Sequence, residues 1–345
     1  MPIAKSLEPP GDRRRFVHYA RARGVAFELA TPERRWDLAV VSSAADVTRW
    51  SRVKAGPKLV FDLVDSYLAV PHTDWRALLR GTAKFATRQH HHLELSYWNS
   101  LRRMCARADA VVCSTEEQAD SIRPYCRNVH VVLDVHAAAA TRAKTTYEAH
   151  QPFRLVWEGL PFTLPLLYSL RPALETIARR HPLELHVITN PHAPRWLGRF
   201  GRVDVPTALH GVFPSAVFHL WREADFAEHV TACDLAIIPI DLDDPFARGK
   251  PENKLLLFWR VGMPVVVSPT PAYLRAMAGA GTTLTARTHD EWASTIERLM
   301  GDAALREKAG RDGKRFAEEL HSESKTLAKW DRVFESVGFV FGQAA

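Results

Sequence analysis

The residues with the clearest chemical potential lie in one segment, DLAIIPIDLDDPFARGKPENKLLLFWRVG, which spans residues 234–262. An apolar, strand-like run enters a polar loop, and the loop leads to Asn253 and Lys254 at the start of an apolar helix. A helix start offers backbone N–H groups and the positive end of the helix dipole, and both attract phosphate. Lys254 adds a full positive charge, and Arg248 and Lys250 can add two more. The segment therefore predicts a site for a diphosphate.

A structural role for Lys254 stays open beside this hypothesis. A lysine at a helix start is unfavourable unless an anion or a carboxylate neutralises it. Glu252 could supply that carboxylate within the protein.

A second set of polar residues, Asp62, Asp65 and His72, lies at or after the end of the run KLVFDLVD, residues 58–65. In a parallel sheet the carboxyl ends of the strands present the functional groups. A carboxylate or imidazole there could orient a hydroxyl or accept its proton. Asp62 could instead be buried and bond nearby backbone, so Asp65 is the preferred candidate.

No metal site is expected from the sequence. The run HHHLE, residues 90–94, places successive histidines in different directions on a helix, so they do not converge on one ion. The cysteines show neither CxxC spacing nor histidine partners, which predicts reduced thiols in the core; they are Cys105, Cys113, Cys126 and Cys233.

Strand-like runs alternate with helix-period segments, which predicts parallel sheets covered by helices on both faces. The strands expected in the first half are residues 25–30, 36–43, 58–65, 108–115 and 128–135. Asp12 and Gly24 suit the two ends of one helix. The strands expected in the second half are residues 153–159, 183–190, 233–240 and 263–269, and residues 288–345 read as helices.

Residues 136–152 read as a linker, because small and polar residues interrupt the alternation there and end on a proline. They divide the chain into two Rossmann-like α/β domains, residues 1–150 and 151–345. We expect the ligand site in a cleft between the carboxyl ends of the two sheets.

The composition favours an ordinary globular enzyme, since 46% of the 345 residues are hydrophobic and 25% are charged. The sequence has neither the apolar run of a membrane span nor the apolar core of a signal peptide, so we expect a cytoplasmic protein.

The formal net charge of +7 falls entirely within residues 1–150. Arg13–Arg15, with Arg21 and Arg23, would make one basic helix that could meet lipid phosphates. We therefore expect a contact with the inner face of an anionic membrane rather than with nucleic acid. A solvated basic surface is the alternative.

The helix and its tail, NKLLLFWRVGMPVVVSP, resemble the donor-binding segment of GT-B glycosyltransferases, in particular the retaining family 4. The matching positions are Asn253, Lys254, Leu255, Gly262, Pro264, Val265 and Val266. The segments FDLVDSY (residues 61–67) and ADAVVCSTEEQADSIRPY (residues 108–125) are similar to elements of that family's acceptor domain. The resemblance covers most of residues 58–320.

The resemblance implies two domains facing each other across a cleft, followed by C-terminal helices. It implies a nucleotide-diphosphate sugar donor, held mainly by the C-terminal domain, and no required metal or other cofactor. Lys254 would hold the phosphates, Glu252 and Asn253 would lie by the donor sugar, Gly159 would allow close approach of the diphosphate, and Asn190 would contact the nucleoside.

Three departures from the family pattern bear on activity. Leu257 stands where a glutamate usually contacts the donor ribose, and Gly249 stands at the position of its partner glutamate. The stretch WEGLPFTLPLL, residues 157–167, contains no arginine or lysine where the family has both.

The sequence thus predicts a retaining, hexosyltransferase-like enzyme that moves a sugar to a hydroxyl of a glycan or glycolipid in surface polysaccharide or glycolipid synthesis. Asp65, Glu252 and His72 are the expected catalytic residues. A non-catalytic GT-B-like protein that binds a glycan or partners a transferase is a second hypothesis, favoured by Leu257 and the missing bases. A sugar-nucleotide epimerase is a third.

Overall fold

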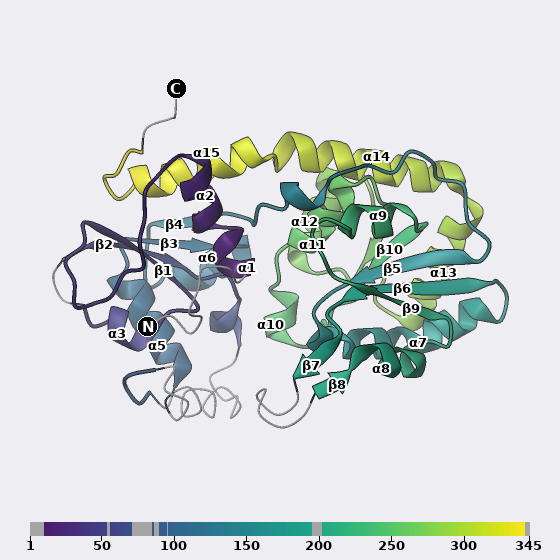
Figure 1. Ribbon diagram of the computed structural model, residues 1–345, viewed down its shortest axis with the longest axis horizontal. Helices are drawn as coiled ribbons and strands as arrows, with labels where there is room; N and C mark the ends of the chain where they lie inside the picture. The colour runs from purple at the N-terminus through teal and green to yellow at the C-terminus, as the bar shows by residue number, and fades with distance from the viewer. Residues whose placement is uncertain are drawn as a thin grey trace. The chain divides into compact units, whose positions relative to one another are not determined.

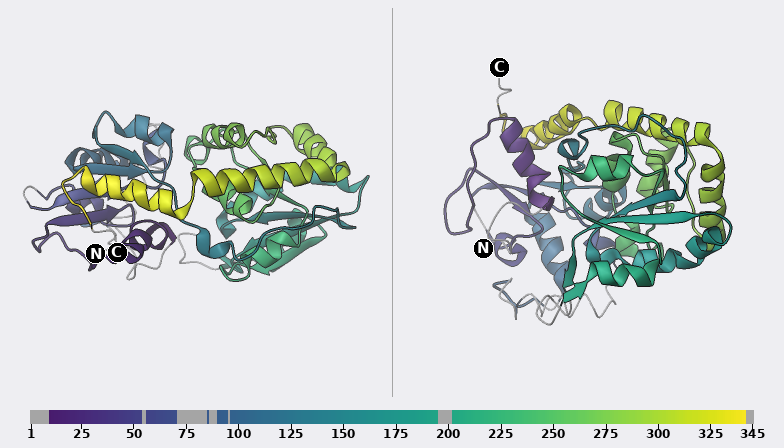
Figure 2. Two further views of the ribbon diagram at one scale, coloured as in Figure 1. Left: turned by 90° about the horizontal axis from the view of Figure 1, so that it is seen from above. Right: turned by 45° about the vertical axis from the view of Figure 1, so that its right-hand side comes forward.

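The computed structural model describes residues 10–53, 56–70, 85, 90–94, 96–194 and 202–341. By their contacts these residues form two compact units. The first unit comprises the chain up to Val135, residues Asp244–Pro251 and the chain from Glu323; the second comprises His136–Asp243 and Glu252–Ser322. Figures 1 and 2 show the chain returning to the first unit with its last helix. The functional division into residues 1–150 and 151–345 stays a prediction.

The first unit is built on a parallel sheet in the order β1-β2-β3-β4. Its strands are β1 (Leu38–Ser42), β2 (Lys58–Asp62), β3 (Ala110–Cys113) and β4 (Val129–Val131). Its helices are α1 (Pro10–Arg13), α2 (Phe16–Ala22), α3 (Val47–Trp50), α5 (Tyr97–Arg107), α6 (Glu116–Ile122), α10 (Pro245–Arg248) and α15 (Glu323–Glu335), with a 3-10 turn at η1 (Tyr67–Ala69).

Alternating side chains of these strands enter two separate apolar layers. Leu59 and Phe61 pack with α3, α5 and α6, whereas Val60 and Val112 pack with α2 and α15. Figure 1 shows α2 and α15 on one side of this sheet and α3 and α5 on the other. The helix-sheet-helix layering expected from the buried parallel strands is therefore confirmed.

The second unit is a five-stranded parallel sheet in the order β9-β6-β5-β10-β11. Its strands are β5 (Phe153–Glu158), β6 (Leu183–Thr189), β9 (Ala216–Leu220), β10 (Leu235–Ile238) and β11 (Val265–Val267), with a small antiparallel pair β7 (His192–Pro194) and β8 (Arg202–Asp204). From β5, the strands β6 and β9 follow on one side of the sheet, and β10 and β11 follow on the other side. The order therefore reverses between β5 and β10, the place where such sheets bind nucleotides.

The helices of the second unit cover both faces of its sheet. They are α7 (Pro165–Ala178), α8 (Val205–Val212), α9 (Phe226–Thr231), α11 (Asn253–Arg260), α12 (Pro271–Gly279), α13 (His289–Gly301) and α14 (Ala303–Leu320), with 3-10 turns at η2 (Ala137–Ala139) and η3 (Pro161–Thr163). Helices α7, α8 and α13 share one apolar core with β5 and β6. On the other face α9 contacts α11 through Phe226 and Phe258, and α14 contacts α11 through Phe316 and Trp259.

The strand predicted over residues 25–30 is wrong. These residues form no strand, and β1 is the edge of the first sheet on that side. Phe27 and Leu29 are instead 37% and 50% exposed, although their alternation with Ala26 and Glu28 matches a half-buried strand. Alternation of apolar and polar residues over six positions does not show whether a neighbouring strand is available for pairing.

The single basic helix predicted around Arg13–Arg15 is also wrong. The chain forms two short helices, α1 and α2, and Arg15 between them is completely buried. Its guanidinium donates hydrogen bonds to both carboxylate oxygens of Asp62 (2.7–2.9 Å) and to Asp134 (3.0 Å). Burial alone would lower the pKa of Arg15, but the charges and hydrogen bonds of these two carboxylates outweigh it and raise that pKa.

The four cysteines are free and buried, as the sequence predicts. Within the residues described, no helix combines the length and the apolar character that crossing a bilayer requires.

We expect Arg15→Met to destabilise the protein by about 3–5 kcal/mol, because Asp62 would stay buried without its cation. Urea unfolding measures this change. Arg127→Met is the matched control, since Arg127 is exposed, and should change stability by less than ~0.5 kcal/mol. Equal losses in the two variants would contradict the role given to the buried pair.

Candidate functional site

The amine of Lys254 occupies the point where the strand order of the second sheet reverses. Lys254 lies in the first turn of α11, and its Nζ donates a 2.6 Å hydrogen bond to the backbone carbonyl of Glu158, the last residue of β5. Parallel sheets of this order bind phosphates at the carboxyl ends of these two strands. The structure therefore places the predicted phosphate-binding lysine where such a ligand is expected.

Two further groups hold the Lys254 amine in place. The Glu158 carboxylate lies 3.7 Å from Nζ, and the ring of Trp157 lies 5.3 Å from it in a cation–π contact. Sequence reasoning proposed Glu252 as the internal carboxylate and did not consider Glu158. The segment after β5 contains no arginine or lysine. The strand itself, however, ends in Glu158, whose carboxylate lies near the Lys254 amine.

Gly159 follows Glu158 and is a glycine because of Trp157. A Cβ at Gly159 would lie 2.4 Å from the Trp157 ring and 3.0 Å from the hydroxyl of Thr163. The ring thus fills the space that a side chain would need. The sequence analysis expected a glycine here so that a ligand could approach the backbone, and this stays a prediction. The structure shows that the Trp157 ring approaches it.

Glu252 immediately precedes α11, and its carbonyl accepts the first helical hydrogen bond, from Leu256 N at 2.9 Å. Tyr273 on α12 is buried, and its pKa is raised by burial and by the carboxylates of Glu252 and Glu158. The two acids therefore lie close enough to influence one phenol. The sequence analysis did not single out Tyr273, whose only signal is its position in the first turn of α12, the helix that follows β11.

Asn253 and Asn190 lie at exits from the same sheet. Asn253 is the first residue of α11 and is partly exposed, and Asn190 is exposed directly after β6. Both are at the carboxyl edge of the second sheet, as the sequence predicts for groups that meet a ligand. Their proposed contacts with donor sugar and nucleoside stay predictions.

The loop that carries Arg248 and Lys250 belongs by its contacts to the first unit. The Ser66 hydroxyl donates a 2.6 Å hydrogen bond to the carbonyl of Gly249, and the rings of Tyr67 and Phe246 lie 5.0 Å apart. Arg248 and Lys250 are thus assigned to the first unit and Lys254 to the second, and a shared role with Lys254 stays a prediction.

The two substitutions in the family motif are built into the packing. A Cβ at Gly249 would lie 2.3 Å from the Ser66 hydroxyl, so a glutamate there would collide with Ser66. Leu257 is 3% exposed and packs in the core below α11. A side chain at position 249 would therefore require Ser66 to move, and a carboxylate at position 257 would be buried in the core.

In the first unit, Asp65 is partly exposed, and with Ser66 and Gly249 it lines a small depression beside α6. Asp62 is 2% exposed and bound by Arg15, so its partner is a buried arginine rather than the nearby backbone considered from the sequence. His72 lies outside the described residues.

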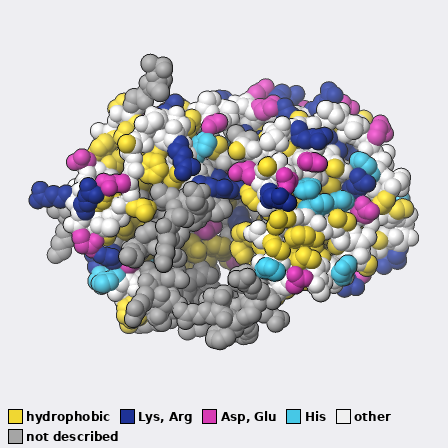
Figure 3. Space-filling view, viewed as in Figure 1, with side chains coloured by type: hydrophobic (Ala, Val, Ile, Leu, Met, Phe, Trp, Pro, Cys, Tyr) yellow, Lys and Arg dark blue, Asp and Glu magenta, His cyan; other side chains and the backbone are white. Residues whose placement is uncertain are grey.

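Histidine side chains gather over β9 and α9 on the face seen in Figure 3. His186 Nδ1 and His219 Nε2 are 2.8 Å apart, and the rings of His219 and His229 are 4.4 Å apart. Burial and the two neighbouring imidazoles lower the pKa of His219 to about 4. In the part of the chain that the structure describes, no group of three or more His, Cys, Asp or Glu is arranged to hold a metal ion.

No protein-family model matches the sequence, and no curated protein matches it either. Solved structures do match the fold. Sucrose-phosphate synthase from Thermosynechococcus elongatus aligns with a TM-score of 0.58 at 9% identity, over 88% of this chain and 74% of that chain. TarM aligns with a TM-score of 0.58 at 10% identity, over 85% of this chain and 54% of TarM.

A third match is an α,α-trehalose-phosphate synthase (UDP-forming) from Burkholderia xenovorans in complex with glucose-6-phosphate. Its TM-score is 0.55 at 13% identity, over 93% of this chain and 78% of that chain. These proteins have the GT-B fold, and at such identities the likeness establishes the fold alone. The GT-B fold predicted from the sequence is confirmed, and membership of family 4 stays a prediction.

Gly159→Ala should destabilise the protein by about 1–3 kcal/mol, because the added methyl group must displace the Trp157 ring. Gly301→Ala is the matched control, since a Cβ at Gly301 meets nothing within 4 Å. In urea unfolding, the double variant Gly159→Ala/Trp157→Leu should lose less than the sum of the two single variants. Additive losses would show that the two residues do not interact.

Proposed function

We propose that this protein is a glycosyltransferase with a nucleotide-diphosphate sugar as donor. The observation that carries the proposal is the Lys254 amine at the end of β5, beside the start of α11 and at the reversal of strand order. A helix start and an ammonium group together offset the charge of a diphosphate. The UDP-forming match has the same fold and supports a nucleoside diphosphate as leaving group.

Electrostatic stabilisation of the departing diphosphate would supply much of the catalysis. Lys254 would exchange its contact with the Glu158 carbonyl for a phosphate oxygen, and Asn253 would bind beside it. Arg248 and Lys250, on the loop before α11, would add cations as the donor enters. Because fixed positive groups serve the diphosphate, we propose that no metal is required.

The carboxylates would bind the hydroxyl groups of the donor and acceptor. Glu158 and Glu252 lie near Lys254 and Tyr273 and can accept hydrogen bonds from donor hydroxyls. Asp65 would orient the acceptor hydroxyl in the first unit, with His72 as a second candidate. We propose the first unit, residues 1–150 in the main, as the acceptor domain and the second as the donor domain, with Gly159 and Asn190 lining the nucleotide site.

Retention of anomeric configuration, a hexosyl donor and an acceptor in surface polysaccharide or glycolipid synthesis are the finer form of the proposal. We also propose a cytoplasmic enzyme that can meet an anionic membrane through its basic first half. The buried Arg15 cannot contribute to that surface, but exposed Arg21 on α2 can.

A non-catalytic protein that binds a sugar nucleotide is the second candidate. The core position of Leu257 favours it, because no carboxylate is available there for the donor ribose. Turnover separates these candidates: a transferase releases free nucleoside diphosphate only when an acceptor is added, whereas a non-catalytic binding protein and an epimerase release none.

Titration calorimetry with UDP-, GDP- and dTDP-sugars in the presence of a chelator should find one series that binds. Lys254→Ala should bind it about 10- to 100-fold more weakly, because one charged hydrogen bond to phosphate is lost. Lys308→Ala is the control, since Lys308 is exposed on α14 and pairs with Asp312.

Unchanged affinity in Lys254→Ala would remove the phosphate assignment. If no nucleotide sugar binds to the wild-type protein, the transferase and the epimerase hypotheses both fail. A requirement for added divalent ions would contradict the metal-free form of the proposal.

A further inference from the structure

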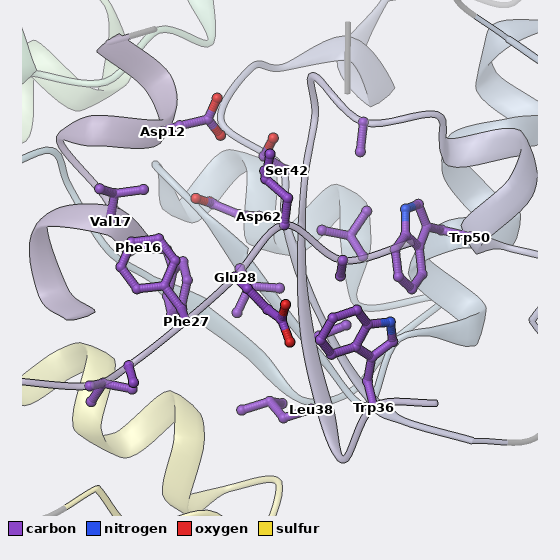
Figure 4. A pocket seen from close by; sticks show the side chains of 18 of the residues that line it. Asp12, Phe16, Val17, Phe27, Glu28, Trp36, Leu38, Ser42, Trp50 and Asp62 are labelled. Carbon is purple, nitrogen blue, oxygen red and sulfur yellow. The ribbon is translucent and has the colours of Figure 1, made fainter. Parts of the chain in front are cut away.

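The first unit contains a cavity of about 510 Å³ along its edge strand β1. Its walls come from β1, from α1 and α2, from residues 25–30 and from Phe339 and Phe341 of the C-terminal tail (Figure 4). The volume is within the range of small-molecule sites, which are apolar with a few polar groups. All of the lining residues belong to the first unit.

The apolar part of the cavity combines aromatic and aliphatic side chains. Phe16 and Phe27 meet edge to face with ring centroids 5.6 Å apart, and Trp36 and Trp50 line the wall beyond β1, as Figure 4 shows. Phe27 on the rim is 37% exposed. Large apolar side chains at the mouth of an apolar cavity indicate a ligand that removes them from water.

The polar part lies at the carboxyl end of the sheet. Ser42 ends β1, and Asp12 on α1 lies beside it at this end of the cavity (Figure 4). Asp62 also lines this end, but Arg15 already binds both of its oxygens. Burial raises the pKa of Asp12, although the nearby Ser42 hydroxyl opposes the shift. Asp12 and Ser42 are thus a carboxyl and a hydroxyl at one end of a cavity whose other lining residues, Glu28 and Asp62 apart, are apolar.

We propose that this cavity binds the apolar body of a hydroxyl-bearing amphiphile, with its hydroxyl group at Asp12 and Ser42. An alkyl or isoprenoid chain matches the apolar walls, and a hydroxyl can donate to the carboxylate while it accepts from Ser42. As a description of the acceptor, this inference rests on the proposed function, and it specifies a lipid alcohol or glycolipid rather than a free sugar.

Binding is tested on the full-length protein without nucleotide, by quenching of tryptophan fluorescence with brominated long-chain alcohols of increasing length. We expect saturable quenching, with affinity rising about fourfold per methylene until the cavity is full and constant beyond that length. Trp50→Phe should remove part of the quenching, because Trp50 lines the cavity.

Ala45→Phe places a ring inside the cavity and should weaken binding by about tenfold or more. Ala106→Phe is the matched control, since Ala106 is exposed on α5, and should bind like the wild type. Asp12→Asn should weaken the binding of brominated alcohols more than the binding of brominated alkanes of equal length. If Ala45→Phe fails to fold, this comparison still tests the inference.

Quenching that rises with chain length without a limit and is equal in Ala45→Phe and Ala106→Phe would overturn the inference, as would the absence of saturable quenching. Because no nucleotide is present, the result is independent of the donor site. Alcohol binding without any nucleotide-sugar binding would refute the proposed function alone. Donor binding without alcohol binding would refute this inference alone.

Discussion

The hydrogen bond from the Lys254 amine to the Glu158 carbonyl is the interaction on which the second unit's site depends. It joins the start of α11 to the end of β5, one of the two strands that flank the reversal in strand order. Trp157 supports the amine from one side, and this ring in turn requires a glycine at position 159. A cation is therefore held in advance where a diphosphate would bind, which reduces the cost of ordering on binding.

The first unit uses the same edge of its sheet differently. The Asp62 carboxylate at the end of β2 is neutralised by the buried Arg15 and is unavailable to a ligand. Ser42 at the end of the neighbouring strand β1 and Asp12 on α1 line a mostly apolar cavity. The two units therefore offer different chemistry at the same topological position: a cation and acids in the second unit, and a carboxyl at one end of a mostly apolar cavity in the first.

Eight strands and the position of Lys254 could be predicted from the sequence, because apolar runs and helix starts are local signals. The buried Arg15 could not, since its partners Asp62 and Asp134 are far away in the sequence and an arginine triplet usually indicates a surface. The partnership of Lys254 with Glu158 was missed for the same reason, as 96 residues separate the two. Residues 25–30 have the alternation of a strand, but pairing depends on a neighbour that local pattern cannot specify.

A crystal structure of the protein with bound UDP tests the central claim most directly. The account predicts a phosphate oxygen within hydrogen-bond distance of Lys254 Nζ, at the end of β5 and the start of α11. A UDP diphosphate bound elsewhere, with the Lys254 amine still on the Glu158 carbonyl, would contradict it.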